Sequence, residues 1–265
     1  MATEMRTSVT TSGINVVVRG EGPPVFLMHG IGGSAQSCEP LAGILADNGY
    51  RTLCWDAPGY GHSADPVSTE DFDHVEAVAE VLHFHDAAPA HIFGTSWGGV
   101  LATCLADRYP ELVRTLTIAD STRGSAVTSE RAQAMRTRIR ELAAQGPRAF
   151  AAARAPRLVS PDADYKVAAA VEADMARVRL SGYRAAAEMM ARTNTASVLH
   201  SLTHPALVLV GDGDSVTGVS ESRLLADSIP GAQFGLILGA GHAACQERPD
   251  RVAAHMLRFL ERNEK

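Results

Sequence analysis

The 265-residue sequence lacks several features that mark particular classes of protein. No apolar run approaches the roughly 20 residues of a membrane-spanning helix, so we expect no membrane partner. Acidic residues outnumber basic ones, 30 against 24, which argues against a nucleic-acid partner. The start, Met1 to Arg6, has no basic head followed by an apolar stretch. We therefore expect no secretory signal and a cytoplasmic protein.

Cysteine is also scarce, and its spacing excludes two kinds of site. The four cysteines are far apart and form no Cys-x-x-Cys pair: Cys38, Cys54, Cys104 and Cys245. This argues against a disulfide framework and a zinc site, and favours reduced thiols. The remaining composition, 46% hydrophobic and 20% charged, is that of a globular protein. Its length predicts one large domain or a domain with an insertion.

Strand and helix patterns alternate along the first 120 residues. Short apolar segments such as Val25–Met28 and Val113–Ala119 are typical of buried strands. Between them, segments such as Gln36–Asn48 carry apolar residues at helical spacing. The alternation returns with a strand at Pro205–Val210 and ends with a helix at Arg248–Arg262. This order predicts an α/β fold, with a mostly parallel sheet covered by helices on both faces.

The pattern changes between residues 121 and 197, where no convincing strand occurs. This stretch is rich in alanine, arginine and methionine, and it predicts about four helices: Ser129–Gln145, Pro147–Arg154, Ala163–Leu180 and Tyr183–Asn194. We therefore divide the chain into an α/β core, residues 1–120 and 198–265, and a helical insert, residues 121–197.

The most informative motif is Gly-x-Ser-x-Gly at Gly94–Gly98. A short apolar strand precedes it and a helix of small residues follows it, which is the setting of a nucleophile elbow. The glycines fit a sharp, strained turn that tolerates only small neighbours. We therefore predict that Ser96 is a nucleophile, with a plain tight turn as the alternative interpretation.

A serine nucleophile needs a general base, and the base needs an acid that orients it. His242 is the predicted base because it follows the glycine-rich segment Gly239–Gly241, directly after the last predicted strand. Asp214 is the predicted acid because it also follows a predicted strand. The resulting chain order of serine, aspartate and histidine is that of α/β hydrolases. Asp120 and Asp212 remain alternatives for the acid.

The glycine-rich segment His29–Ser34 follows the predicted strand Val25–Met28. Acyl transfer develops negative charge on the attacked carbonyl oxygen, and preorganised backbone N–H groups stabilise that charge. We predict that the N–H groups of Ile31 and Trp97 form this oxyanion hole. A phosphate cradle is the competing interpretation of the glycines, but no Gly-Lys-Ser/Thr sequence follows them.

Five motifs in this order resemble the α/β-hydrolase superfamily over nearly the whole chain: His29-Gly30, Asp56–Ser63, Gly94–Gly98, Gly211–Asp214, and Gly241-His242 with Glu247–Pro249. The resemblance implies the α/β-hydrolase fold, a mostly parallel eight-stranded sheet with a helical cap inserted after strand 6. It also implies that Ser96, Asp214 and His242 form a catalytic triad beneath that cap.

Within the superfamily, the segments Leu27–Gly32 and Ser181–Ala186 are similar to those of 3-oxoadipate enol-lactonases. That resemblance implies a small lactone substrate carrying a carboxylate, which needs a cation in the site. Arg123 is the candidate cation because it enters the insert directly after a predicted sheet strand. His29 is the other candidate for a substrate contact.

The sequence therefore predicts an enzyme, a serine hydrolase that cleaves a small carboxylic ester or lactone. One alternative uses the same triad to cleave a carbon–carbon bond in a β-diketone-type intermediate of aromatic degradation. Another is a small-molecule-binding protein without catalysis, since one fold hosts many functions. A small-molecule substrate is the expected partner, and a homo-oligomer stays open. No metal or organic cofactor is expected, because a Ser-His-Asp triad is self-sufficient.

Overall fold

The computed structural model describes residues 5–264, so residues 1–4 and residue 265 lie outside it. The expectation of no secretory signal rests on a segment that starts in residues 1–4, and that part lies outside the described residues. The described residues form one eight-stranded sheet in the order β1-β2-β4-β3-β5-β6-β7-β8. Its strands are β1 (Met5–Val9), β2 (Asn15–Arg19), β3 (Pro24–Met28), β4 (Arg51–Trp55), β5 (Ala90–Thr95), β6 (Val113–Ala119), β7 (Ala206–Gly211) and β8 (Gln233–Ile237). Strand β2 runs antiparallel to β1 and β4, and the other neighbouring strands pair in parallel. The predicted mostly parallel sheet is therefore confirmed.

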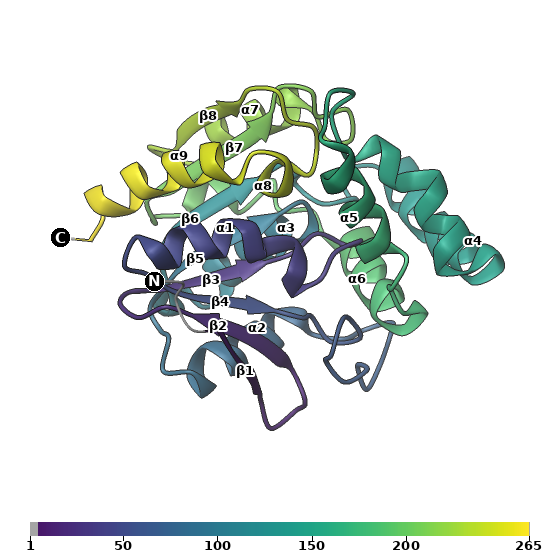
Figure 1. The fold of residues 1–265 in the computed structure, drawn as a ribbon, viewed down its shortest axis with the longest axis horizontal. Helices are drawn as coiled ribbons and strands as arrows, with labels where there is room; N and C mark the ends of the chain where they lie inside the picture. The colour runs from purple at the N-terminus through teal and green to yellow at the C-terminus, as the bar shows by residue number, and fades with distance from the viewer. Residues whose placement is uncertain (1–4, 265) are drawn as a thin grey trace.

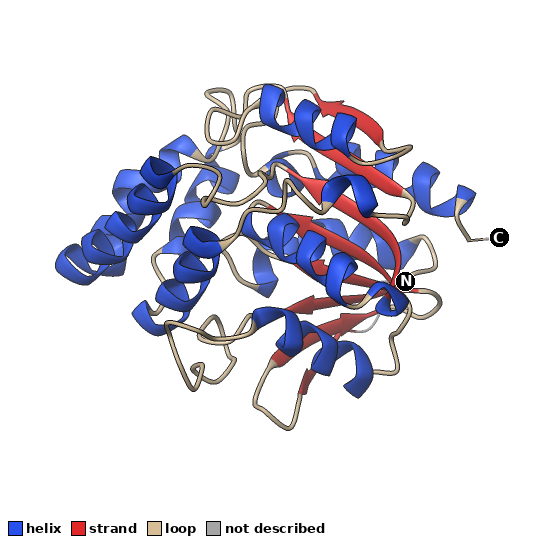
Figure 2. Ribbon diagram, turned by 180° about the vertical axis from the view of Figure 1, so that it is seen from behind, coloured by secondary structure: helices blue, strands red, loops and turns tan. Residues whose placement is uncertain are grey.

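Helices cover both faces of this sheet, because each buried strand sends alternate side chains to opposite faces. On β3, Val25 and Leu27 enter one hydrophobic cluster, whereas Phe26 and Met28 enter the other. The first cluster is shared with α1 (Ala35–Asp47), α8 (Ala244–Glu247) and α9 (Pro249–Arg262). The second cluster is shared with α2 (His74–Phe84), α3 (Trp97–Arg108) and α7 (Val219–Ser228). Figures 1 and 2 show these helical layers from opposite sides.

The helical insert lies between β6 and β7. It contains α4 (Ser129–Arg154), α5 (Tyr165–Met175) and α6 (Leu180–Arg192), which Figure 1 shows grouped at one end of the molecule. Helix α4 joins two helices that the sequence predicts separately, and Gly146 inside it has a non-helical φ of 74°. The predicted helix at Ala163–Leu180 is too long, because α5 ends at Met175 and α6 begins at Leu180.

The sequence pattern does not predict two further elements. Strand β1 has mostly exposed side chains, because it is an edge strand held by backbone pairing with β2. It therefore lacks the apolar alternation that indicates a half-buried strand. Helix α8 has only four residues, which is too short to show a helical period.

The parallel strands bring distant loops to one edge of the sheet. Ile31 follows β3, Ser96 follows β5, Asp214 follows β7 and His242 follows β8, and the insert leaves from the same edge after β6. Carboxyl ends of parallel strands are where α/β proteins place their ligand sites.

Among the described residues, no helix is both long and apolar enough to cross a membrane.

Candidate active site

Ser96 occupies a strained turn between β5 and α3. Its φ and ψ are 54° and −116°, and a positive φ is unfavourable for a residue with a side chain. The surrounding glycines make this turn possible. A Cβ on Gly94 would lie 2.1 Å from the Gly98 carbonyl oxygen, and a Cβ on Gly98 would lie 2.4 Å from the Met28 carbonyl oxygen. The turn therefore depends on glycine at both positions, as the motif predicts.

The structure brings Ser96, His242 and Asp214 into one hydrogen-bonded chain. His242 Nε2 lies 2.9 Å from Ser96 Oγ, and His242 Nδ1 lies 3.0 Å from Asp214 Oδ2. These residues come from three loops separated by 118 and 28 residues in the sequence. An ionised carboxylate can only accept hydrogen bonds, so His242 Nδ1 must carry the proton when the imidazole is neutral. Nε2 is then free to accept the Ser96 hydroxyl proton.

The surroundings of Asp214 keep its carboxylate ionised. Burial raises the pKa of Asp214, but hydrogen bonds and charge from His242, Thr217 and Val216 outweigh it and lower the pKa to about 2. Oδ1 accepts the N–H of Val216 at 2.7 Å and the N–H of Thr217 at 3.1 Å. Oδ2 also accepts the Thr217 hydroxyl at 2.6 Å. The carboxylate is therefore fixed and charged beside the imidazole.

The two alternative acids lie elsewhere and bond backbone groups. Asp120 Oδ1 accepts the N–H of Gly211 at 2.8 Å, and burial raises the pKa of Asp120 well above its ordinary value. Asp212 Oδ1 accepts the N–H of Gly239 at 2.7 Å. Of the three aspartates, Asp214 is the one that forms a hydrogen bond with the His242 ring.

Both predicted oxyanion donors lie next to Ser96. Trp97 is the first residue of α3, and N–H groups in the first turn of a helix lack helical acceptors. Ile31 lies in the loop after β3, where a Cβ on the preceding Gly30 would be 3.3 Å from the Ser96 Cβ. The Tyr60 hydroxyl donates to the Ile31 carbonyl oxygen at 3.0 Å and holds this loop in place.

His29 does not have the predicted substrate contact. Its side chain is fully buried, and both ring nitrogens bond to the backbone. Nδ1 donates to the Gly30 carbonyl oxygen at 2.8 Å, and Nε2 accepts the N–H of Ala57 at 3.1 Å. Burial lowers the pKa of His29, which favours the neutral ring that this pattern requires. Because a peptide is planar and trans, holding the Gly30 carbonyl also sets the direction of the Ile31 N–H.

Arg123 is also placed differently from the prediction. Its Nε and one terminal nitrogen donate to the two oxygens of Glu221 at 2.9 Å and 3.2 Å. This bidentate pair occupies the guanidinium, since Arg and a carboxylate match in a planar fork. Arg123 therefore anchors the start of the insert to α7 and does not face the candidate site.

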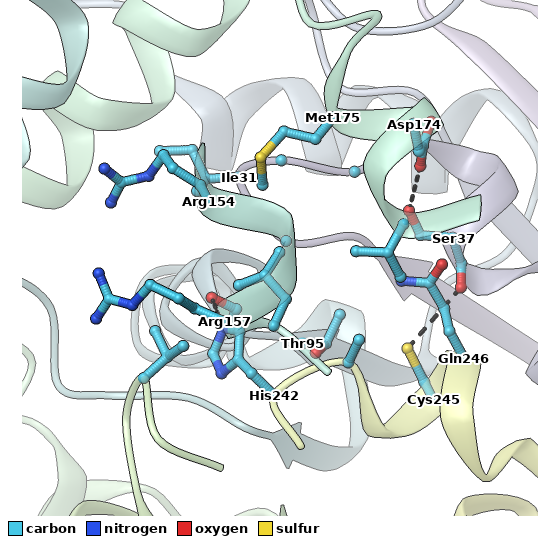
Figure 3. A pocket seen from close by; sticks show the side chains of 18 of the residues that line it. Ile31, Ser37, Thr95, Arg154, Arg157, Asp174, Met175, His242, Cys245 and Gln246 are labelled. Carbon is cyan, nitrogen blue, oxygen red and sulfur yellow. Dashed lines mark hydrogen bonds between the residues drawn. The ribbon is translucent and has the colours of Figure 1, made fainter. Parts of the chain in front are cut away.

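Other arginines of the insert line a cavity beside Ser96. This arginine cavity has a volume of about 100 Å³ and is lined by Arg138, Arg154 and Arg157 together with Ser96 and His242. Figure 3 shows Arg154 and Arg157 extending in the same direction, with His242 below Arg157.

The positive charge of this cavity is only partly neutralised. Arg154 forms a salt bridge to Glu141 at 3.2 Å, whereas Arg138 and Arg157 have no carboxylate within 4.0 Å among residues 5–264. Asp174 also lines the cavity, but its oxygens accept from Ser34 Oγ at 2.7 Å and from Ser37 Oγ at 2.5 Å. The cavity therefore favours a negatively charged group.

A second cavity of about 250 Å³ meets the first at Ser96. The two share Ile31, Ser96, Arg138 and Val216 in their linings. Trp97 lines only the second cavity, whereas His242 lines only the arginine cavity. The serine hydroxyl is thus placed between two spaces of different chemistry.

Sequence reasoning does not single out Arg138, Arg154 and Arg157 from the other arginines of the insert. Most arginines on surface helices are solvated, and the spacing gives no sign of which ones face inward. The one available signal is that Arg154 and Arg157 lie three residues apart, a spacing that puts side chains on one face of a helix. Arg154 is the last residue of α4, and Arg157 ends the short 3-10 helix that follows it, Ala155–Arg157.

This sheet, with a strained serine turn and later aspartate and histidine loops at one edge, is the architecture of an α/β hydrolase. A sequence model of the alpha/beta hydrolase fold family matches residues 23–249, and the chain belongs to that family.

Within this family the chain is similar to several hydrolases. It is 26% identical over 254 residues to a poly(3-hydroxyalkanoate) depolymerase of Ectopseudomonas oleovorans, covering 90% of this chain and 84% of that protein. It is 26% identical over 245 residues to 3-oxoadipate enol-lactonase 2 of Acinetobacter baylyi, covering 89% and 90%. Its fold matches that of a thermophilic esterase from Thermogutta terrifontis with a TM-score of 0.87, 25% identity, and 99% and 100% coverage. The chain is therefore an enzyme of the α/β-hydrolase type.

Proposed function

We propose that this enzyme is a serine hydrolase that cleaves small carboxylic esters or lactones, with Ser96, His242 and Asp214 as its triad. The observation that carries the proposal is the continuous chain of hydrogen bonds, 2.9 Å and 3.0 Å long, from the serine hydroxyl to the aspartate. Similarity to an esterase and to an enol-lactonase supports the same reaction class.

In the proposed mechanism, His242 takes the hydroxyl proton of Ser96 while Ser96 Oγ attacks the substrate carbonyl carbon. The N–H groups of Ile31 and Trp97 stabilise the negative oxygen that develops. His242 then gives its proton to the leaving oxygen, and the carbon–oxygen bond breaks to form an acyl-enzyme. Water, deprotonated by the same imidazole, releases the acid and restores the serine.

The two cavities support a placement for each half of the proposed substrate. The leaving oxygen must lie within reach of His242 Nε2, because that nitrogen protonates it. His242 lines the arginine cavity, so the alcohol half of the ester lies there, and the acyl half lies in the second cavity. The substrate that fits best carries a negative charge on its alcohol half. The lining of the arginine cavity supports Arg138 and Arg157, instead of Arg123, as the cation of the site.

The helical insert acts as the cap of the proposed enzyme. Residues 121–197 supply the three arginines and other walls of the arginine cavity, such as Leu158 and Met175, and residues 1–120 and 198–265 form the core. A cap of this kind excludes water and strengthens the electrostatic interactions inside the site.

Intact-mass measurement after treatment with a fluorophosphonate tests the nucleophile. We expect one adduct on the wild type and none on Ser96→Ala, because only an activated serine reacts. Hydrolysis of short esters, enol-lactones and a β-diketone then identifies the reaction. An unlabelled wild-type enzyme, or cleavage of the β-diketone alone, would contradict the esterase proposal.

Charge recognition is tested with two esters that share an acyl group and differ only in a carboxylate on the alcohol. We expect Arg138→Gln and Arg157→Gln to raise KM for the anionic ester by about ten-fold or more, since a hydrogen bond to a charged group contributes about 1.5–3 kcal/mol. Neither change leaves a carboxylate unpaired. The rate for the neutral ester should change by less than about two-fold, and equal effects on both esters would contradict the assignment.

A further inference from the structure

A buried carboxylate joins the His242 loop to the helical insert. Glu247, the last residue of α8, is only 6% exposed. Its Oε1 accepts the N–H of Gly241 at 2.7 Å, and its Oε2 accepts the N–H of Ser160 at 2.8 Å. Gly241 directly precedes His242, whereas Ser160 belongs to the insert. One carboxylate therefore bonds to the backbone of both parts.

The His242 loop and the insert are also joined by a direct hydrogen bond between backbone groups. The N–H of Ala243, which directly follows His242, donates to the Leu158 carbonyl oxygen at 2.7 Å. On the other side of the histidine, a Cβ on Gly241 would lie 2.6 Å from the Ser160 nitrogen. The backbone on both sides of His242 is thus held against residues 158–160.

The contacts of Glu247 exclude a direct part in the chemistry. Both oxygens accept from backbone groups, and Glu247 is absent from the linings of the two cavities that meet at Ser96. Hydrogen bonds to an ionised acceptor are stronger than neutral ones. Removing the carboxylate would leave one buried N–H unpaired on each segment, which is costly in a water-poor environment.

We propose that Glu247 is a positioning residue, which aligns the His242 ring with Ser96 by holding the His242 loop against the insert. The proposal rests on the proposed function in one respect, the use of His242 as the base. The Glu247 carboxylate also couples the helical insert to the α/β core. Arg157 lines the arginine cavity one residue before Leu158, so a substrate bound there contacts the segment that holds the base.

The variant Glu247→Gln tests this role with little change of shape. A glutamine amide offers one oxygen and one NH₂ group, so one of the two backbone N–H groups would face another donor. We expect kcat per active site to fall by about ten-fold or more, with KM changed by less than about two-fold. Active sites are counted by fluorophosphonate titration, so unfolded protein does not enter kcat.

Two further variants separate positioning from charge. Asp212→Asn removes a carboxylate that bonds Gly239 on the same loop but retains an oxygen for that single N–H. It should leave kcat within about two-fold of the wild type. Glu247→Asp keeps the charge but is one methylene shorter, so it cannot reach both N–H groups, and it should lose kcat despite its charge.

A purely structural role predicts a different result. Fewer titratable sites or a lower Tm, with full kcat per titrated site in Glu247→Gln, would overturn the proposal. If wild-type Ser96 is not labelled, the proposed function fails. The positioning role of Glu247 can then still be tested by the NMR signal of the proton between His242 Nδ1 and Asp214. A changed shift or faster solvent exchange of that proton in Glu247→Gln supports positioning, whereas an unchanged signal overturns it.

Discussion

Two aspartates at the same edge of the sheet have pKa values shifted in opposite directions because their surroundings differ. Asp120 accepts the Gly211 N–H, and burial raises its pKa well above the ordinary value. Asp214 has bonds from His242, Thr217 and Val216, which lower its pKa to about 2 despite burial. Asp214, which bonds the His242 ring, is therefore the one placed to stabilise an imidazolium that forms during the reaction.

This difference predicts unequal effects of the same substitution. Asp214→Asn should reduce kcat/KM on the order of 10³–10⁴-fold, because an amide stabilises the wrong tautomer of His242. Asp120→Asn should reduce it by less than about ten-fold, since Asp120 bonds the backbone of Gly211 and not the His242 ring, and the amide keeps an oxygen for that N–H. Steady-state rates on one short ester measure both, and a larger loss in Asp120→Asn would reverse the assignment of the acid.

The pH dependence of the Asp214 interaction follows from the direction of its pKa shift. The folded pKa, about 2, lies below the ordinary value of 3.8, so this interaction stabilises the fold above about pH 4 and is lost as the pH falls through 2. Asp214 thus stays ionised at any pH well above 2, and the carboxylate that orients His242 is retained under mildly acidic conditions.

At the scale of elements, glycine has opposite roles in α1 and in the serine turn. Gly43 lies inside α1, and a Cβ there would meet only the tip of Arg19 at 3.5 Å, an ordinary van der Waals distance. Gly94, at the end of β5, lies against the backbone of α3, where a Cβ has no room. The first glycine costs helix stability, whereas the second permits the turn.

Alanine substitutions should therefore act in opposite directions. Gly43→Ala should raise the free energy of unfolding by about 0.5–1 kcal/mol, because alanine is the better helix former. Gly94→Ala should lower it by several kcal/mol, since the Gly98 carbonyl at 2.1 Å would have to move. Denaturant unfolding measures both values, and similar values for the two variants would contradict this account of the elbow.

At the scale of the whole molecule, a second buried carboxylate docks the insert on the core. Asp174 of α5 accepts from the hydroxyls of Ser34 and Ser37, at the start of α1, and from Arg177 at 2.8 Å. Glu247, which bonds Ser160, and Glu221, which bonds Arg123, are further buried carboxylates that bridge the insert and the core. Figure 3 shows the bond from Ser37 to Asp174 beside the cavity.

Loss of this contact should loosen the insert while the sheet stays intact. In Asp174→Ala we expect faster amide hydrogen exchange in α5, by about ten-fold or more, because two buried hydroxyls lose their acceptor. Exchange in β5 and β6 should stay as in the wild type. Glu172→Ala removes the same charge from the exposed face of α5 and serves as the control. Equal exchange in the two variants would show that Asp174 does not hold the insert.

Local sequence patterns determined the buried strands, the serine turn and the order of the candidate triad. Buried strands need apolar runs, and the sharp turn at Ser96 needs glycines within a few residues, so both leave a signal in neighbouring positions. Parallel strands then bring Asp214 and His242 to the same edge of the sheet, whatever their separation along the chain.

Only the tertiary structure decided which charged side chains face the site. Arg123 pairs with Glu221, whereas Arg138 and Arg157 line the cavity, although all are arginines of one insert. One partner of Asp214, His242, and one partner of Glu247, Ser160, also lie far away in the sequence. Helical spacing defines a face but not the direction in which it points, because that direction is set by packing against residues distant in the chain.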